Sequence, residues 1–277
     1  MTRDDPLMDH DAKRAEFRRL HESGTFTMPN PHDVGSCRLL TELGFPALAT
    51  TSGGFAYSLG RLDMTVGRDA LVAHVEDLCA ATHLPINVDA ENCFPDAPGG
   101  VRATVELLAG AGASGCSIED YDPVTTSILG RDEAVRRVEV AATAAREHGV
   151  VLTARAENHL RGIADLDDTI ARLCAYRDAG ADVLYAPVLP DAEAITRVVE
   201  ETGMPVNVLL RPGGPTVAEL GALGVRRLSV GGTLASVAYG ALYRAAARLR
   251  DEGVLDVGEG GLAYDVVVRA FSGEVPS

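Results

Sequence analysis

The sequence predicts an α/β protein, and specifically a (β/α)8 barrel. Short apolar runs rich in Val, Ile and Leu recur at eight places along the 277 residues, with amphipathic helical stretches between them. Several helical stretches end in Gly, and Ala-Gly-Ala precedes two of the runs, at 111–113 and 179–181. Near-continuous apolar strands are typical of a parallel sheet covered by helices. Eight strand-helix units therefore favour a barrel over other parallel sheets.

The predicted elements follow in order along one domain of 1–277. A leading helix occupies about 9–22. The predicted strands lie within 25–30, 47–53, 85–91, 115–121, 150–157, 182–188, 205–212 and 226–232, and the clearest helices are 68–82, 131–149 and 166–180. A helical extension of about 233–271 goes beyond a minimal barrel, and it either caps the barrel or packs on another subunit. A doubly wound open sheet is the alternative, but PNPHDVGS is a poor glycine-rich phosphate loop.

Composition excludes several classes of partner. The formal net charge of -15 argues against nucleic acid and acidic membrane surfaces, although a locally positive pocket can still bind an anion. The five cysteines form no CxxC pair, and their odd number predicts a reduced, cytoplasmic protein. The N-terminal residues are too charged for a signal peptide, and no apolar run approaches the roughly 20 residues that span a bilayer.

Polar residues gather where four predicted strands end, which is where barrel enzymes place their sites. Asp89 and Glu91 end one run, and Glu119 and Asp120 end the next. Residues two apart on a strand point to the same side, so these acids should converge on one cavity. Such oxygen ligands suit Mg²⁺, or Mn²⁺, held partly through water. Arg155 would then bind a substrate carboxylate; alternatively, it neutralises Asp89 or Glu119 and nothing binds.

Other candidates carry weaker signals. Thr51, Ser52 and Gly53 form either a plain turn or an anion site made of backbone N–H groups and hydroxyls. His159 follows the fifth strand and is more simply a surface residue than a ligand. Tyr57 is either a pocket residue or part of the core.

The segment PNPHDVGSCRLLTELGFPALATTSGGFAYSLGRLD, followed by VDAE, SIED and TARAEN, resembles the isocitrate lyase/phosphoenolpyruvate mutase superfamily over about 26–271. The resemblance implies that Asp89 touches Mg²⁺ and that Asp63, Glu91 and Glu119 hold its waters. It also implies that the turn of 51–53 and Arg155 bind the substrate. The superfamily fold is a (β/α)8 barrel whose eighth helix swaps between subunits of a dimer or tetramer.

One departure from the superfamily is informative. Its lyases carry a Lys-Lys/Arg-Cys-Gly-His segment on a mobile loop after the fourth strand, and the Cys is the acid/base. Here YDPVTTSILGRDEA contains no Cys, His or Lys. Cys116 lies before the acids, within the strand, and cannot replace it. The chain therefore resembles a short-loop branch of the superfamily.

These observations predict a Mg²⁺-dependent lyase that cleaves a C–C bond, or decarboxylates, in a small 2-oxo or 2-hydroxy carboxylate. We expect Arg155, Glu119, Tyr57 and His159 to carry catalysis, with Glu157 or a metal-bound water as further acid/base candidates. A phosphonate mutase or hydrolase is one alternative, and it would need loop cations such as Arg61 and Arg211. A barrel that binds small oxyacids without turnover is the other.

Overall fold

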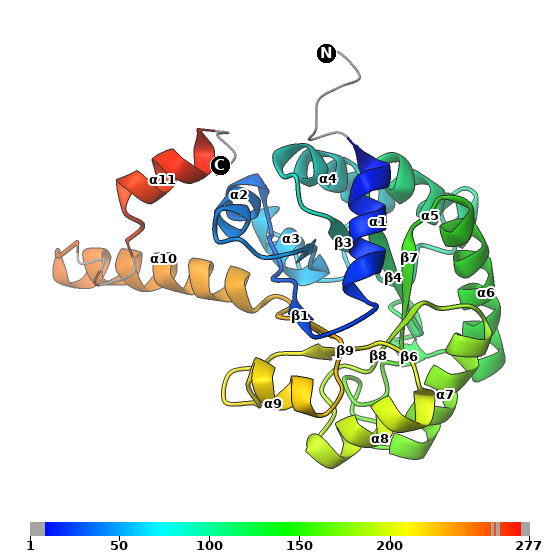
Figure 1. Ribbon diagram of the computed structural model, residues 1–277. Coiled ribbons are helices and arrows are strands. Elements are labelled where there is room, and N and C mark those ends of the chain that lie inside the picture. The colour runs from blue at the N-terminus through cyan, green and yellow to red at the C-terminus, as the bar shows by residue number, and fades with distance from the viewer. Residues whose placement is uncertain (1–8, 256–257, 259–260, 273–277) are drawn as a thin grey trace.

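The computed structural model describes residues 9–255, 258 and 261–272, and its centre is a sheet of eight parallel strands in the order β1-β10-β9-β8-β7-β4-β3-β2 (Figure 1). The strands are β1 (Phe26–Thr27), β2 (Leu48–Ala49), β3 (Ile86–Asp89), β4 (Gly115–Glu119), β7 (Val151–Arg155), β8 (Val183–Tyr185), β9 (Val206–Leu209) and β10 (Arg227–Ser229). Each predicted apolar run contains one of them. The prediction of a (β/α)8 barrel is therefore confirmed.

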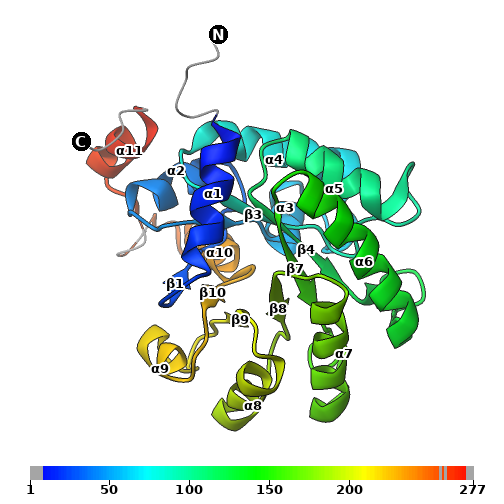
Figure 2. The ribbon, with the colours of Figure 1, turned by 45° about the vertical axis from the view of Figure 1, so that its right-hand side comes forward.

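Helices alternate with the strands and cover the outer face of the sheet (Figure 2). They are α1 (His10–Leu20), α2 (Val34–Glu42), α3 (Ser52–Ser58), α4 (Arg68–Ala81), α5 (Gly100–Gly110), α6 (Arg131–Glu147), α7 (Leu166–Asp178), α8 (Ala192–Thr202) and α9 (Val217–Ala222). Local sequence sets several helix starts. Asp33, Asp165, Asp191 and Thr216 are N-caps whose side chains accept a hydrogen bond from the backbone N–H three residues later.

The barrel closes between its first two strands. A backbone hydrogen bond from Ala49 N–H to Pro29 C=O (3.0 Å) links the chain after β1 to β2. Buried Asn30 strengthens this junction between β1 and β2, called the seam below, because its amide donates to the carbonyl of Thr50 (2.7 Å). The amide oxygen of Asn30 also accepts from the two backbone N–H groups that follow β10, at 2.8 and 2.9 Å. One side chain thus joins the ends of three strands.

Apolar side chains seal the amino-terminal end of the barrel. Phe17 of α1 packs with strand residues that include Phe26, Val151 and Val183. His21 completes this plug, because its ring lies edge-on to the rings of Phe17 and Phe26 at centroid distances of 4.8 and 5.1 Å. The polar part of the barrel interior therefore faces the carboxyl ends of the strands.

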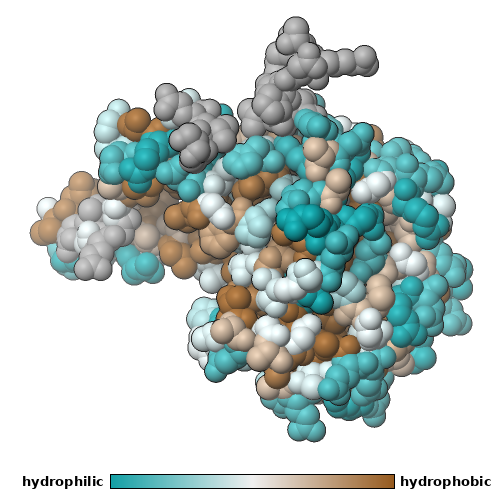
Figure 3. Space-filling view, viewed as in Figure 1, coloured by the Kyte–Doolittle hydropathy of each residue, from teal (hydrophilic) through white to brown (hydrophobic). Residues whose placement is uncertain are grey.

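The C-terminal part of the chain forms an arm made of α10 (Thr233–Glu252) and α11 (Tyr264–Phe271). α10 projects away from the barrel, and α11 returns to α2 (Figure 1). Within α10, all of which the structure describes, Ala235 alone is buried. Leu242 and Tyr243 are 65% and 73% exposed, and apolar surface follows the arm and its junction with the barrel (Figure 3). The swapped helix remains a prediction, and this arm is the element that it concerns.

Replacing Asn30 tests the importance of the seam. Asn30→Ala removes three hydrogen bonds and leaves buried backbone groups unpaired. We expect the free energy of unfolding to fall by about 2–4 kcal/mol in urea titrations. Thr65→Ala, which removes an exposed hydroxyl bonded to a neighbouring carbonyl, is the control and should cost less than about 1 kcal/mol. Equal effects of the two substitutions would contradict this account of barrel closure.

Candidate active site

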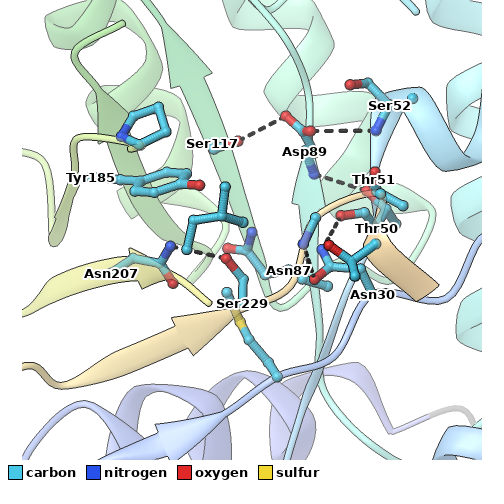
Figure 4. A pocket seen from close by; sticks show the side chains of 18 of the residues that line it. Asn30, Thr50, Thr51, Ser52, Asn87, Asp89, Ser117, Tyr185, Asn207 and Ser229 are labelled. Atoms are coloured by element: carbon cyan, nitrogen blue, oxygen red, sulfur yellow. Dashed lines mark hydrogen bonds between the residues drawn. The ribbon is translucent and has the colours of Figure 1, made fainter. Parts of the chain in front are cut away.

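A cavity of about 650 Å³ opens at the carboxyl ends of the strands. Most of the residues predicted from sequence line it: Thr51, Ser52, Gly53, Tyr57, Asp63, Asp89 and Arg155. Figure 4 shows Asp89 on one wall, beside Ser52 and Ser117, with Asn87, Asn207 and Ser229 further along the lining. Residues that are far apart in sequence thus share one polar cavity.

Asp89, at the end of β3, is held from two sides. Its backbone N–H donates to the hydroxyl of Thr50 (2.8 Å), which fixes the end of the strand. One carboxylate oxygen accepts from the backbone N–H of Ser52 (3.3 Å), and the other accepts from the guanidinium of Arg155 (2.8 Å). The carboxylate therefore has a fixed position on the cavity wall.

The turn that follows β2 packs tightly beside this carboxylate. Thr51 is the N-cap of α3, and its hydroxyl accepts from the backbone N–H of Gly54 (3.3 Å). A Cβ at Gly54 would lie 2.5 Å from the Thr51 methyl group, so a side chain at this position would clash. A Cβ at Gly53 would lie 3.4 Å from the carboxylate of Asp63. Glycine thus lets the backbone of the turn pack tightly beside the cavity.

Arg155, at the end of β7, is the centre of an ion-pair network. Its guanidinium contacts the carboxylates of Asp89 (2.8 Å), Glu119 (3.2 Å) and Glu157 (2.8 Å). It also lies 5.1 Å from the centroid of the Tyr185 ring. The predicted internal salt bridges therefore exist in this structure. Arg155 alone does not balance the charge, because its one guanidinium faces three carboxylates; Arg161 is a second cation, 3.8 Å from Glu119.

Acidic groups outnumber basic ones around Asp89. Glu91 is buried, and its pKa is raised to about 8 by burial and by the charges of Asp89 and Asp63. Burial also raises the pKa of Glu119 well above its usual range, and one of its oxygens is buried without a hydrogen-bond partner. Arg161 adds one more guanidinium, 3.4 Å from Glu157. A surplus of desolvated carboxylates is the arrangement that a bound cation would stabilise.

These carboxylates fit a divalent ion that keeps part of its water shell. In the described part of the chain, no three His, Cys, Asp or Glu side chains come close enough to form a direct ligand cage. Mg²⁺ seldom needs such a cage, because it is usually bound through one or two carboxylates and several waters. Asp89 lines the cavity and interacts electrostatically with Glu91 and Glu119, and Asp63 interacts with Glu91.

A short hairpin follows β4, in the segment where the sequence lacks the Lys-Lys/Arg-Cys-Gly-His pattern. Strands β5 (Tyr121–Asp122) and β6 (Ser127–Ile128) pair antiparallel directly after β4. Arg161 lies over the face of the Tyr121 ring, 3.4 Å from its centroid, and so connects the hairpin to Glu157. No Cys, His or Lys occurs in the hairpin, so this segment brings no such acid/base to the site.

The adjacent acids Glu119 and Asp120 have different surroundings. Asp120 accepts hydrogen bonds from the hydroxyl of Tyr176 (2.6 Å), from Arg172 (3.1 Å) and from the backbone N–H of Glu157 (2.9 Å). It therefore ties the end of β4 to α7, whereas Glu119 contacts Arg155.

The predicted acid/base residues also lie in different surroundings. Tyr57 lines the cavity and is 46% exposed, with its ring 6.4 Å from that of Tyr239 in α10. Glu157 is buried and paired with Arg155, and His159 is not part of the cavity lining. Cys116 is fully buried within β4, as its position in the strand predicted.

Several polar residues that were not predicted from the sequence line the interior of the barrel: Asn30, Asn87, Asn207, Arg227 and Ser229. The available signal was the period-two spacing within the predicted strands. Asn87 precedes Asp89 by two residues, and Arg227 and Ser229 flank buried Leu228. Inward positions of these strands are therefore polar where a packed barrel would have apolar side chains.

Arg227 and Asn207 are the most deeply buried of these residues, at 1% exposure each. The guanidinium of Arg227 donates to the amide oxygen of Asn207 (3.0 Å) and to the hydroxyl of Thr153 (2.8 Å). It also lies 3.4 Å from Nε2 of His21, whose other ring nitrogen is 2.7 Å from the carbonyl of Phe17. None of these partners is acidic, and burial lowers the pKa of Arg227 to about 9.

The fold and the site define a class: a barrel with an acidic, oxygen-rich pocket at the carboxyl end of its strands. The phosphoenolpyruvate phosphomutase family model matches residues 17–250. The chain belongs to this family, which confirms the resemblance found in the sequence.

Three similar proteins indicate the class of reaction. A solved structure from Burkholderia cenocepacia, provisionally named a lyase/mutase, is 48% identical and superposes with a TM-score of 0.90 over 97% of this chain and 98% of that one. An oxaloacetate decarboxylase of Rhodopseudomonas palustris is 29% identical over 76% of this chain and 73% of its own. An oxaloacetate acetylhydrolase solved with its product oxalate is 26% identical, with a TM-score of 0.82 and coverages of 92% and 94%. The decarboxylase and the acetylhydrolase agree with the predicted class of reaction.

The buried His21 gives a pH prediction. Burial and the charges of Arg227, Arg18 and Arg226 lower its pKa from 6.5 to about 3. Between these values the unfolded chain binds a proton that the folded protein does not, so the free energy of unfolding should decrease as pH falls. His21 contributes at most about 1.4 kcal/mol per pH unit to the change in the free energy of unfolding.

Urea unfolding of His21→Gln from pH 7 to pH 4 tests this prediction. The variant should lose part of the acid sensitivity, whatever its stability at pH 7. His148→Gln, at the exposed end of α6, is the control and should follow the wild-type profile. A His21→Gln profile parallel to that of the wild type would show that His21 titrates normally.

Proposed function

We propose that this protein is a Mg²⁺-dependent lyase that cleaves a C–C bond, or decarboxylates, in a small 2-oxo or 2-hydroxy carboxylate. The surplus of carboxylates around Asp89, on the wall of the carboxyl-end cavity, is the observation that carries the proposal. Family membership and the decarboxylase and acetylhydrolase relatives support the same class of reaction.

Each group would have a separate task. A bound Mg²⁺ would stabilise negative charge on the substrate oxygen as the bond to the adjacent carbon breaks. Asp89 would be its direct ligand, and Asp63, Glu91 and Glu119 would hold its waters. The turn of Thr51, Ser52 and Gly53 would orient the substrate carboxylate. Arg155 would position Asp89 and limit repulsion among the acids.

Tyr57 is the favoured proton donor. Of the predicted acid/base side chains it alone lines the cavity, in a chain segment that the structure describes fully. Its phenol could protonate the carbon that loses its bond, a step that the missing loop Cys would otherwise perform. Glu157, His159 and a metal-bound water are the remaining candidates.

Phosphonate chemistry is the second candidate, because the matched family is named for a phosphomutase. The loop cations that it would need are poorly placed. Arg61 and Arg211 are exposed and do not line the cavity, and Arg211 instead borders a separate pocket of about 280 Å³. Turnover of oxaloacetate and substituted malates, but not of phosphonopyruvate, would separate the two reactions.

We further propose that the protein is a cytoplasmic homo-oligomer, a dimer or tetramer. The arm presents Leu242 and Tyr243 to solvent, and a swap of α10 between subunits would bury them. All five cysteines are free thiols, which fits a reducing compartment. In the part of the chain that the structure describes, no helix is both long and apolar enough to cross a bilayer.

Calorimetry with Mg²⁺ and oxalate, a mimic of the pyruvate enolate, tests the metal site. Wild-type protein should bind oxalate only when Mg²⁺ is present. Asp89→Asn keeps the shape of the side chain but removes the charge that attracts the ion, so we expect at least a 100-fold loss in Mg²⁺-dependent oxalate affinity.

Asp69→Asn, whose wild-type side chain is 95% exposed, is the matched control and should bind like the wild type. Absence of Mg²⁺ uptake by the wild-type protein with oxalate supplied would refute the proposed metal site. Binding of oxalate without turnover of any 2-oxo or 2-hydroxy acid would favour the non-catalytic barrel.

A further inference from the structure

Tyr57 belongs to a helix whose backbone is fixed by buried neighbours. In α3, Ala56 is fully buried, and Phe55 stacks on the ring of His74 at a centroid distance of 3.8 Å. The next residue, Tyr57, is exposed and lines the cavity. Among the residues that the structure describes, Tyr239 provides the only ring that contacts the Tyr57 ring. The orientation of Tyr57 therefore depends on a residue outside its own helix.

Tyr239 lies in the second turn of α10, between two aromatic neighbours. Its ring meets that of Tyr57 edge to face, at 88° and with the centroids 6.4 Å apart. Its ring also lies 5.7 Å from that of His32, which is buried. The backbone N–H of His32 donates to the hydroxyl of Ser36 (3.0 Å), so this supporting ring extends from a fixed backbone.

The start of α10 is packed tightly against α3. A Cβ at Gly54 of α3 would lie 3.2 Å from the Cβ of Ala235 and 3.1 Å from the Cβ of His32. Ala235 is itself fully buried. Three residues from the same turns of α10 line the cavity: Thr233, Ser236 and Val237. This end of α10 is thus part of the cavity wall, and it carries Tyr239 in a fixed position.

The contact with Tyr239 limits the directions in which the Tyr57 ring points. Exposed side chains otherwise exchange rotamers within nanoseconds, and edge-to-face packing is a preferred geometry of aromatic pairs. Geometry matters for a group that transfers a proton, because a misplacement of about 1 Å can lower a rate by about 100-fold.

We propose that Tyr239 is a positioning residue, whose ring directs the phenol of Tyr57 toward the carbon that it protonates. The inference rests on the proposed function, in which Tyr57 is the proton donor. The phenol proton moves to the carbon, where the electron pair of the broken bond forms the new C–H bond. Water then returns a proton to the phenolate. The ring of Tyr239 is needed for this role, and its hydroxyl is not.

Exchange of the methyl protons of pyruvate in D₂O tests the proposal without the natural substrate. The group that protonates an enolate also removes the proton in the reverse direction, and ¹H NMR follows the loss of the methyl signal with Mg²⁺ present. Wild-type protein should catalyse this exchange, and Tyr57→Phe should not. Tyr239→Ala should lower the rate by about tenfold or more, whereas Tyr239→Phe should retain at least half of it.

Binding of oxalate with Mg²⁺ distinguishes a positioning role from a purely structural one. Oxalate needs no proton donor, so Tyr239→Ala should bind it with an affinity within about twofold of the wild type. Tyr264→Ala removes an exposed ring from α11 and is the control, which should exchange pyruvate like the wild type. A wild-type exchange rate in Tyr239→Ala, a tenfold loss in Tyr239→Phe, or an equal loss of oxalate affinity in Tyr239→Ala would overturn the proposal.

The same two measurements separate this inference from the proposed function. Absence of Mg²⁺-dependent oxalate binding by the wild-type protein would refute the proposed metal site and with it the proposed function. Normal oxalate binding without pyruvate exchange in the wild type, or with exchange that persists in Tyr57→Phe, would refute the pairing of Tyr57 with Tyr239 alone.

Discussion

The ion-pair network of Arg155 is the interaction on which the site depends. The guanidinium contacts carboxylates from the end of β3, from the end of β4 and from the segment after β7, and so holds three neighbouring strand ends together. Ionised carboxylates that contact the same guanidinium would, without it, repel one another by several kcal/mol in a partly buried environment. Arg155 and Arg161 make the cluster possible, but the carboxylates still outnumber these two positive charges. That residual charge is the physical basis for a cation site, whereas the pKa values of Glu91 and Glu119 are raised chiefly by burial.

The barrel interior separates opposite charges along its axis. Carboxylates dominate the mouth, whereas Arg227 lies near the closed end among neutral hydrogen-bond acceptors. An apolar barrel core would have favoured stability, so the polar interior is better understood as a binding surface.

Two segments outside the eight-stranded sheet are held in different ways. The hairpin of β5 and β6 is fixed by pairing of its strands and by the stacking of Arg161 on Tyr121, so the region after β4 is ordered close to the barrel. The arm, in contrast, leaves apolar side chains of α10 exposed, although α11 is anchored to α2 by an ion pair between Arg269 and Glu42. Exposed apolar surface of this kind commonly marks a contact with another chain.

The sequence by itself determined the eight strands, because their apolar runs and glycine-ended helices depend on local patterns. The sequence also predicted that Asp89, Arg155 and the turn of 51–53 lie close together, because parallel strands end at one edge of a barrel. Which polar side chains pair with one another was decided only by the tertiary structure. Asp120 binds Tyr176, which is 56 residues away, while the adjacent Glu119 faces Arg155. The hydrogen bond from Arg227 to Thr153 arises in the same way, because contacts across a barrel join residues that no local pattern connects.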